Sequence, residues 1–253
     1  MKILDVVGLT KRFAGLTALD AVSFTVEAGE ILGLFGPNGA GKTTCFHCLS
    51  GFAAADSGRV IFDGREIGGE PSHRLARVGI ARTFQVVKPF RDLTAAQNVT
   101  VALGHREYAG ATALFGSWRG TAIRSRALGL LDRVGLAAHA DRKAGLLPLG
   151  MLKRLELARA LALEPRLLLL DEPLGGLSPE EMRAAAELIA GLRAGGLTIV
   201  LVEHQMRVAM ALVDRVVVLD HGALIASGPP ERVRRDPRVI EAYLGKDAVA
   251  QGH

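Results

Sequence analysis

One nine-residue stretch constrains the fold of this chain more than any other. It matches every fixed position of the pattern G-x-x-x-x-G-K-[ST] and consists of Gly36, Pro37, Asn38, Gly39, Ala40, Gly41, Lys42, Thr43 and Thr44. An apolar run at 31–35 precedes it and an apolar segment at 45–49 follows it, so it lies between a predicted strand and a predicted helix. Glycines let the backbone turn until successive N–H groups point inward, and the helix N-terminus adds partial positive charge. The stretch therefore predicts a phosphate-binding loop.

Two side chains of this loop would contact a bound nucleotide and its metal ion. Lys42 can reach the β- and γ-phosphates, and the Thr43 hydroxyl can ligate Mg²⁺. The alternative is a glycine-rich turn that binds nothing, but such a turn has no reason to match every fixed position between a strand and a helix. We therefore predict a nucleoside triphosphate and Mg²⁺ as cofactors.

Length, composition and charge favour an ordinary globular protein. The 253 residues can bury a substantial core, and 49% of them are hydrophobic against 23% charged. No apolar run approaches the roughly 18 residues that cross a bilayer, and we see no signal peptide. The net charge of +5 could suit nucleic acid or an anionic membrane, but no long basic block is present. We expect a cytoplasmic protein with no nucleic-acid partner, unless another protein holds it at a membrane.

The two cysteines, Cys45 and Cys48, have the C-x-x-C spacing of redox and metal sites. They follow the phosphate loop within its predicted helix, and no second Cys or His pair completes a zinc site. Two buried cysteines on one helix are therefore the preferred interpretation.

The chain changes character along its length. The first third has strand patterns at 3–7 and 21–26 and a hairpin arm at 60–62, next to the strand of the phosphate loop. From about Thr94 to Leu163 an Ala- and Leu-rich helical pattern predominates, with a predicted surface excursion at Gly104–Gly120. A β-α-β-α-β pattern then predicts parallel strands joined by right-handed crossovers. Its elements are Leu167–Leu170, Glu180–Ala194, Thr198–Val202, Gln205–Val213 and Val216–Leu219.

The last part of the chain predicts a hairpin and one helical stretch. His221 and Gly222 form a turn signal before the strand Ala223–Ala226, and a helical pattern covers Pro230–Leu244. The fold class is therefore α/β, with a mainly parallel sheet, an antiparallel β subdomain and an inserted α-helical subdomain.

Two acids follow the apolar strand 167–170, where ligands of open α/β sheets collect. Asp171 can hold Mg²⁺, and Glu172 can polarise the water that attacks the γ-phosphate. An acid pair after a strand can also cap a helix, but the phosphate loop favours the catalytic interpretation. His204 follows the strand 198–202 and can reach the γ-phosphate, although a lone histidine is more often structural. Gln85 lies between the strand-rich and helical parts, and either senses Mg²⁺ and the attacking water or is an ordinary surface residue.

These motifs, in this order, resemble the ATP-binding cassette (ABC) ATPases over about Leu4 to Leu244. The segment 147–161 resembles their signature L-S-G-G-Q and the basic helix that follows it. The resemblance implies ATP as the nucleotide, Phe13 as the aromatic that stacks on adenine, Gln85 as the Q-loop glutamine and a further Mg²⁺ ligand, and His204 as the switch histidine. It also implies that the signature touches ATP held by a second subunit. The signature positions here are Leu147, Pro148, Leu149, Gly150 and Met151.

Three signature residues depart from the family pattern. Pro148 replaces Ser, Leu149 replaces the first Gly and Met151 replaces Gln, so Pro148 offers neither a hydroxyl nor an N–H to the γ-phosphate. We expect Pro148 at the first position of the helix, with the helix dipole and the backbone N–H groups of Gly150 and Met151 facing the phosphate. Ser178 also stands where the family often has the D-loop aspartate.

Within the family, the chain looks most like the ATPase subunits of branched-chain amino acid importers. Three segments carry that likeness, at 79–85, 154–159 and 239–245. It implies transmembrane permease subunits, a second ATPase subunit in a homo- or heterodimer, an indirect solute-binding protein, and a place on the inner face of the cell membrane. The implied cargo is a branched-chain or hydrophobic amino acid or a related amide. A lipopolysaccharide or lipid exporter shares several of these motifs, and a soluble ABC ATPase acting on DNA or ribosomes is a further alternative.

We predict a single ABC domain over residues 1–253. Its nucleotide-binding core comprises 1–93 and 155–228, its helical subdomain about 94–154, and its C-terminal helix and tail 229–253. The permease would dock near Gln85, where Val86, Val87, Pro89 and Phe90 are apolar, although these four residues could equally form the core between the subdomains.

Overall fold

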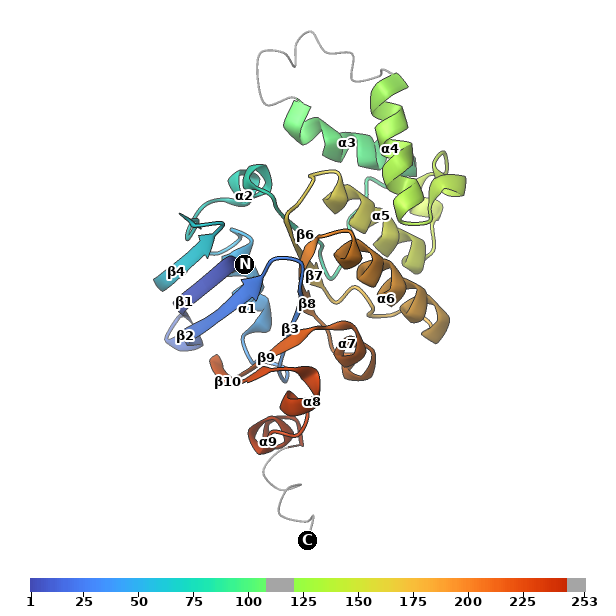
Figure 1. Cartoon of the computed structure of the whole chain (residues 1–253). Helices are drawn as coiled ribbons and strands as arrows, with labels where there is room; N and C mark the ends of the chain where they lie inside the picture. The colour runs from blue at the N-terminus through green and yellow to red at the C-terminus, as the bar shows by residue number, and fades with distance from the viewer. Residues whose placement is uncertain (108–120, 245–253) are drawn as a thin grey trace.

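The computed structural model of the chain describes residues 1–107 and 121–244. Figure 1 shows two sheets side by side, with a lobe of helices projecting from one side of the sheets. Of the predicted excursion at Gly104–Gly120, residues 108–120 lie outside the described residues, whereas residues 104–107 continue a helix, so the predicted start was too early.

The first sheet has four antiparallel strands in the order β2-β1-β4-β5. β1 and β2 are longer than the predicted strands, because β-bulges let each continue past its regular register. The predicted hairpin arm at 60–62 is confirmed as the end of β4, which pairs with the short β5. The strands are β1 Lys2–Phe13, β2 Leu16–Glu27, β4 Ser57–Phe62 and β5 Arg65–Glu66.

The second sheet has six strands in the order β10-β9-β3-β8-β7-β6. All neighbours pair in parallel except β9 and β10, which form the predicted antiparallel hairpin. Its turn residues His221 and Gly222 both have positive φ, as a tight two-residue hairpin turn requires. The strands are β3 Ile31–Phe35, β6 Ile80–Arg82, β7 Leu167–Asp171, β8 Thr198–Val202, β9 Arg215–Asp220 and β10 Ala223–Gly228.

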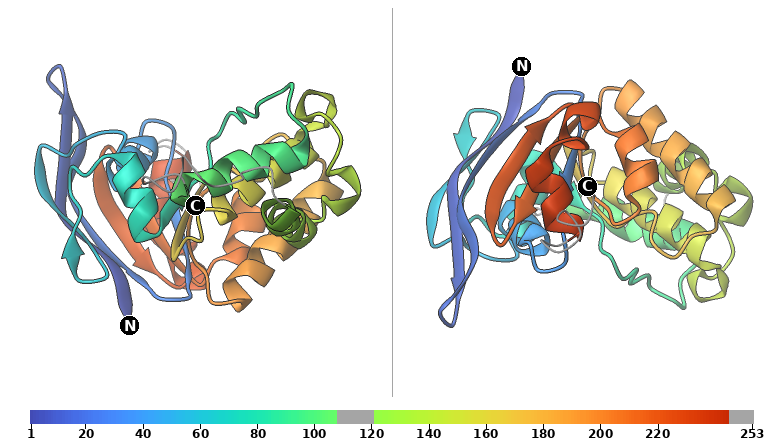
Figure 2. Two further views of the ribbon diagram at one scale, coloured as in Figure 1. Left: turned by 90° about the horizontal axis from the view of Figure 1, so that it is seen from above. Right: turned by 90° about the horizontal axis from the view of Figure 1, so that it is seen from below.

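Alternate residues of the parallel strands enter two separate cores. Leu167 and Leu169 of β7 pack with the antiparallel sheet and α1 (Lys42–Leu49), whereas Leu168 and Leu170 pack with helices on the opposite face. Both faces of this sheet are therefore covered, which explains why its strands are continuous apolar runs. Figure 2 shows the resulting layers, with the antiparallel sheet on one side and the helices on the other.

The helical lobe is built from three long helices: α3 Ala95–Glu107, α4 Thr121–Arg133 and α5 Leu149–Leu161. The boundary that we drew at residue 154 lies inside α5, whose second half continues toward β7. The long helix α6 Pro179–Ala194 and the shorter α7 Met206–Leu212 agree with the predicted crossovers between parallel strands.

Two local predictions were incomplete or wrong. The sequence analysis missed α2 (Ser72–Val78) and β6, which are short and carry weak periodicity. The C-terminal helical stretch is two helices, α8 (Pro230–Val233) and α9 (Pro237–Leu244), instead of one. Pro237 disfavours helical backbone at Asp236, and the Asp236 side chain accepts the N–H of Arg238 at 2.9 Å to begin α9. Within residues 1–107 and 121–244, no helix combines the length and apolar character needed to cross a membrane.

Candidate nucleotide-binding site

The phosphate loop connects β3 to α1, as predicted, and its backbone explains its glycines. Gly36 and Gly41 have φ values of 147° and 99°. A Cβ atom at Gly36 would lie 2.1 Å from the carbonyl oxygen of Leu219, and one at Gly41 would lie 2.4 Å from that of Ala18. Any larger residue would therefore push the loop away from the strands behind it.

Lys42 lies at the start of α1 with its ammonium group inside the loop. Its Nζ donates to the carbonyl oxygens of Gly36 and Pro37, at 2.7 and 2.8 Å. Burial lowers the pKa of Lys42, and the negative charge of Glu172 opposes that shift. A cation held in a ring of backbone groups is well placed to meet an anionic phosphate.

The two cysteines of α1 are buried and free, in agreement with the preferred interpretation. Burial raises the pKa of Cys48 to about 11 and that of Cys45 further still. Both groups therefore pack as apolar side chains behind the phosphate loop.

Glu172, Gln85 and His204 meet at the carboxyl edge of the parallel sheet. Gln85 Nε2 donates to Glu172 Oε2 at 2.9 Å, and His204 Nε2 lies 2.9 Å from Glu172 Oε1. These residues come from three segments that are more than 30 positions apart in sequence, and all three were proposed as catalytic. The acid pair does not cap a helix, because Ser178 caps α6 in a capping box with Glu181.

Asp171 forms a buried ion pair that the sequence analysis did not foresee. Arg82 Nη2 donates to Asp171 Oδ2 at 2.8 Å, and Arg82 Nη1 donates to Ser50 Oγ at 2.9 Å. The guanidinium group also lies 5.4 to 5.6 Å from three phenylalanine ring centroids, those of Phe46, Phe52 and Phe84. Arg82 thus connects α1 to the segment that leads into Gln85.

The proposed metal ligands fit a magnesium ion. Thr43, Gln85 and Asp171 line one groove between the sheet edge and the helical lobe. A hydroxyl, an amide and a carboxylate supply the oxygen ligands that Mg²⁺ prefers. Because Arg82 occupies Oδ2 of Asp171, the other carboxylate oxygen is the one that could face the ion or its water.

The signature residues lie at the start of α5, apart from the phosphate loop. Pro148 is the residue that precedes the helix, with extended backbone, so our placement of Pro148 at the first helical position was wrong by one residue. Its lack of an N–H matters little there, since Leu149 is the first residue with helical backbone. Leu147 and Gly150 are buried, Met151 is half-buried and Leu149 is 43% exposed.

Phe13 ends β1 at a distance in sequence from the other site residues. Its ring is 48% exposed and lies 5.3 Å from the Lys11 ammonium. An exposed aromatic face at a strand end is compatible with stacking on a purine base.

The sequence analysis did not predict Glu203, which supports the loops that carry the site residues. Glu203 is buried and accepts the backbone N–H of Leu174, His204 and Gln205, which fixes the loops after β7 and β8. Burial raises its pKa, and these three donors oppose that shift. Its place beside His204 in a buried strand end was the available signal, because a buried acid needs donors.

The C-terminal helix also reaches the site. The Tyr243 hydroxyl of α9 accepts the N–H of Gly36, the first residue of the phosphate loop, at 2.8 Å. Burial raises the pKa of Tyr243, so the hydroxyl stays protonated. Tyr243 also lies beside Met206, at the start of the helix that follows His204.

Comparison with known proteins agrees with this geometry. A model of the ABC transporter family matches residues 19–175, and one of branched-chain amino acid ATP-binding cassette transporters matches residues 223–249. The chain is 44% identical to the high-affinity branched-chain amino acid transport ATP-binding protein BraF of Pseudomonas aeruginosa, over 96% of this chain and 98% of that protein. It is 41% identical to LivG, which has the same description, from Escherichia coli, with the same coverage.

Solved structures give the same result for the fold. A nucleotide-free ATP-binding cassette from an ABC transporter superposes with a TM-score of 0.86 and 30% identity, over 97% of this chain and 100% of that one. A cassette in its ADP conformation superposes with a TM-score of 0.86 at 31% identity, over 97% and 100% of the two chains.

The chain belongs to the ABC transporter family, as an ATP-binding cassette, the ATPase unit that powers transport. Within this family, its likeness is to the cassettes of branched-chain amino acid transporters, and it extends through the C-terminal region that contains α9. The predicted family and fold class are thereby confirmed, and the lipid-exporter alternative is not favoured.

Proposed function

We propose that ATP hydrolysis by this chain powers the import of branched-chain or other hydrophobic amino acids, or related amides, through transmembrane permease subunits. The observation that carries the catalytic part is the placement of Glu172 between Gln85 and His204, at the sheet edge next to the phosphate loop. The likeness to the BraF and LivG proteins supports the choice of cargo.

In this mechanism, ATP stacks on Phe13 and its phosphates are held by the backbone N–H groups of residues 36–44 and by Lys42. Glu172 accepts a proton from the attacking water or orients it, while Gln85 and His204 hold the carboxylate in place. Thr43, Asp171 and Gln85 would hold Mg²⁺, and the bound ion would neutralise charge on the phosphates.

A second ATPase subunit would complete the site with its own signature residues. A likeness to a dimeric cassette bound to ADP and phosphate, with a TM-score of 0.77 and 27% identity over 90% of this chain and 99% of that one, supports a dimer. Closing and opening of this dimer would drive the permease between its two accessible states.

The permease would dock beside Gln85 and hold the chain at the inner face of the membrane, with a solute-binding protein acting indirectly. Val86 is 65% exposed and Phe90 is 47% exposed, whereas Val87 and Pro89 are half-buried. This exposure favours a contact surface over a core between subdomains.

The test is transport by the reconstituted assembly. The chain is purified with its permease and incorporated into vesicles that contain ATP and Mg²⁺ inside, with the solute-binding protein added at the permease's opposite face. We expect labelled leucine or isoleucine to be taken up into these vesicles by the wild-type protein, and no uptake with Glu172→Gln. ATP-dependent movement of a lipid, with no uptake of any amino acid or amide, would reject the proposed cargo.

A further inference from the structure

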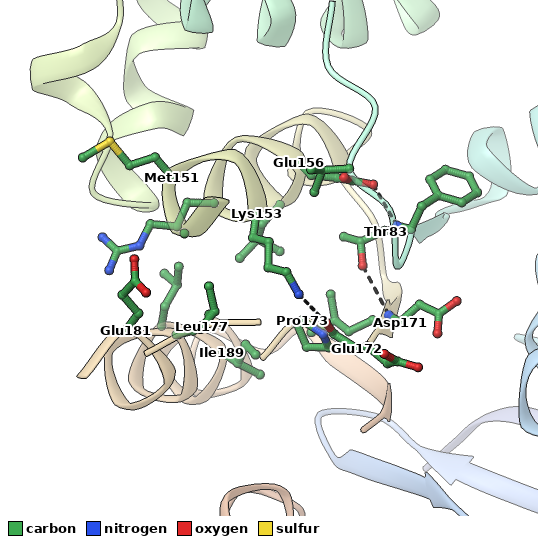
Figure 3. A pocket seen from close by; sticks show the side chains of 18 of the residues that line it. Thr83, Met151, Lys153, Glu156, Asp171, Glu172, Pro173, Leu177, Glu181 and Ile189 are labelled. Carbon is green, nitrogen blue, oxygen red and sulfur yellow. Dashed lines mark hydrogen bonds between the residues drawn. The ribbon is translucent and has the colours of Figure 1, made fainter. Parts of the chain in front are cut away.

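The signature helix α5 is bonded directly to the backbone of the catalytic residue. Lys153 lies three residues after Gly150 and its Nζ donates to the backbone carbonyl oxygen of Glu172, at 2.6 Å. Figure 3 shows this side chain crossing from α5 to the turn that contains Glu172 and Pro173. The Glu172 N–H donates to the carbonyl oxygen of Val202 at 2.9 Å. Both polar backbone groups of Glu172 are thus fixed, in addition to its side chain.

The backbone of Glu172 needs this support. Its φ of 48° lies in the left-handed region, which is unfavourable for a residue with a side chain. Such a conformation persists only where surrounding contacts determine it, and such residues are frequent in active sites. The charged hydrogen bond from Lys153 is one of those contacts, and it comes from the helical lobe instead of from the sheet.

One turn further along α5, Glu156 contacts the segment that leads to Gln85. Its Oε1 accepts the N–H of Phe84 at 2.7 Å, and Phe84 precedes Gln85, which bonds the Glu172 carboxylate. α5 therefore contacts both the backbone of Glu172 and the segment that positions the Glu172 side chain (Figure 3).

The surroundings of Lys153 favour this contact. It lines a cavity of about 270 Å³ between α5, α6 and the end of β7, together with apolar side chains such as Leu157, Leu177 and Ile189. Burial lowers the pKa of Lys153, and the charges of Glu203, Glu172 and Glu156 oppose that shift. An ammonium group in such a cavity requires a hydrogen-bond acceptor, and the Glu172 carbonyl supplies it.

We propose that Lys153 is a positioning residue that couples the signature end of α5 to Glu172. A shift of α5 when its signature engages nucleotide on the second subunit moves the Lys153–Glu172 contact and hence the catalytic carboxylate of the same chain. Nucleotide bound to the phosphate loop of one subunit thereby changes the position of Glu172 in the other subunit. The inference rests on the proposed function, because it requires an ATPase dimer.

The first test separates binding from hydrolysis. Lys153→Met keeps the length and apolar stem of the side chain but removes the donor, whereas Lys153→Arg retains a charged donor. Misplacing a catalytic group by about 1 Å costs on the order of 100-fold in rate. We expect kcat to fall about 10- to 100-fold in Lys153→Met, with the Kd for ATP unchanged, and to recover at least partly in Lys153→Arg. Lys143→Met, which changes an exposed lysine of the helical lobe, serves as the matched control.

A double-variant cycle tests whether Lys153 acts through Glu172. In single-turnover measurements, Lys153→Met should slow the Glu172→Gln protein by less than twofold, because the group that it positions is already gone. The inference is overturned if Lys153→Met slows both backgrounds by the same factor, or if Lys153→Met alone leaves kcat unchanged.

Hydrogen exchange provides a measurement that does not depend on hydrolysis. Peptides that cover residues 171–177 should exchange faster in Lys153→Met and at the wild-type rate in Lys153→Arg. Unchanged exchange in Lys153→Met shows that the contact does not hold the turn and overturns the inference. A wild-type protein that binds ATP without hydrolysing it would instead reject the proposed function, while the exchange result would still test the contact.

Discussion

The carboxyl edge of the parallel sheet and the signature end of α5 are built in opposite ways. At the sheet edge, Gln85 and His204 contact the carboxylate of Glu172, so the proposed catalytic group is oriented within one chain. At the start of α5, Pro148 forms no side-chain cap and the exposed side chain of Leu149 is apolar, so the only polar groups offered there are the backbone N–H groups of the first helical turn. In the proposed dimer, the sheet edge is the half of the nucleotide site that one chain completes by itself, and the start of α5 is the half that requires a second subunit.

The strongest test of the complete half is Glu172→Gln, because general-base catalysis typically contributes about 10²- to 10⁴-fold. We expect kcat for ATP hydrolysis to fall by that factor while ATP binding, measured by equilibrium fluorescence, is retained. Glu180→Gln, an exposed acid in the first turn of α6, is the matched control and should hydrolyse ATP normally. Wild-type turnover in Glu172→Gln would show that the preorganised carboxylate is not the base.

Lys42→Ala should affect binding instead of chemistry. Hydrogen bonds to charged groups are worth about 1.5–3 kcal/mol, which corresponds to about a 10- to 100-fold weaker Kd for ATP. Lys143→Ala, at an exposed lysine of the helical lobe, should leave the Kd unchanged. Equal nucleotide affinity for Lys42→Ala and wild type would contradict the phosphate-loop assignment.

Pro148→Ser tests the start of α5 by adding the side-chain hydroxyl that this end of the helix lacks. A serine before the first helical residue can cap α5 and offers a hydroxyl to the partner's γ-phosphate, each worth about 1 kcal/mol. We therefore expect ATPase activity to rise about fivefold, with a higher melting temperature. Pro148→Ala is the control for both effects, since alanine supplies neither cap nor hydroxyl and should raise neither the ATPase activity nor the melting temperature.

The smallest effect concerns the thiols behind the phosphate loop. Burial raises the pKa of Cys48 to about 11, so both it and Cys45 stay protonated in the folded protein at neutral pH. This raised pKa favours folding below the ordinary thiol pKa of about 8.5, and that contribution is lost as pH rises toward 11. At pH 8 we expect slow alkylation in the native protein and fast alkylation in urea, followed by mass spectrometry. Fast native labelling would mean that α1 opens readily.

The sequence predicted the sheet-edge half of the site better than the contacts that support it. The positions of residues 36–44, Asp171 and Glu172 could be anticipated because a phosphate loop and a strand that ends in acids meet at the carboxyl edge of a parallel sheet. The acid pair by itself could equally have capped a helix, and only its combination with the phosphate loop favoured the nucleotide site. The pairing of Glu172 with Gln85 and His204 could be anticipated only as proximity, because side-chain orientation depends on the loops that Glu203 holds.

The supporting residues escaped prediction because their partners are far away in sequence. Arg82 and Asp171 are separated by 89 positions and Lys153 and Glu172 by 19, and neither pair has a spacing that marks a contact. Short elements such as β6 were missed for a similar reason, since three residues carry too little periodicity to identify a strand.

The hydrogen bond between Tyr243 and Gly36 has a practical consequence for anyone who dissects this cassette. The last described helix, α9, supports the phosphate loop through this hydrogen bond, although 207 positions separate the two residues in sequence. A truncation or chimaera whose junction falls before Pro237 would expose an amide donor at the root of that loop. Swaps of the tail between related cassettes should therefore keep α9 with the body of its own protein.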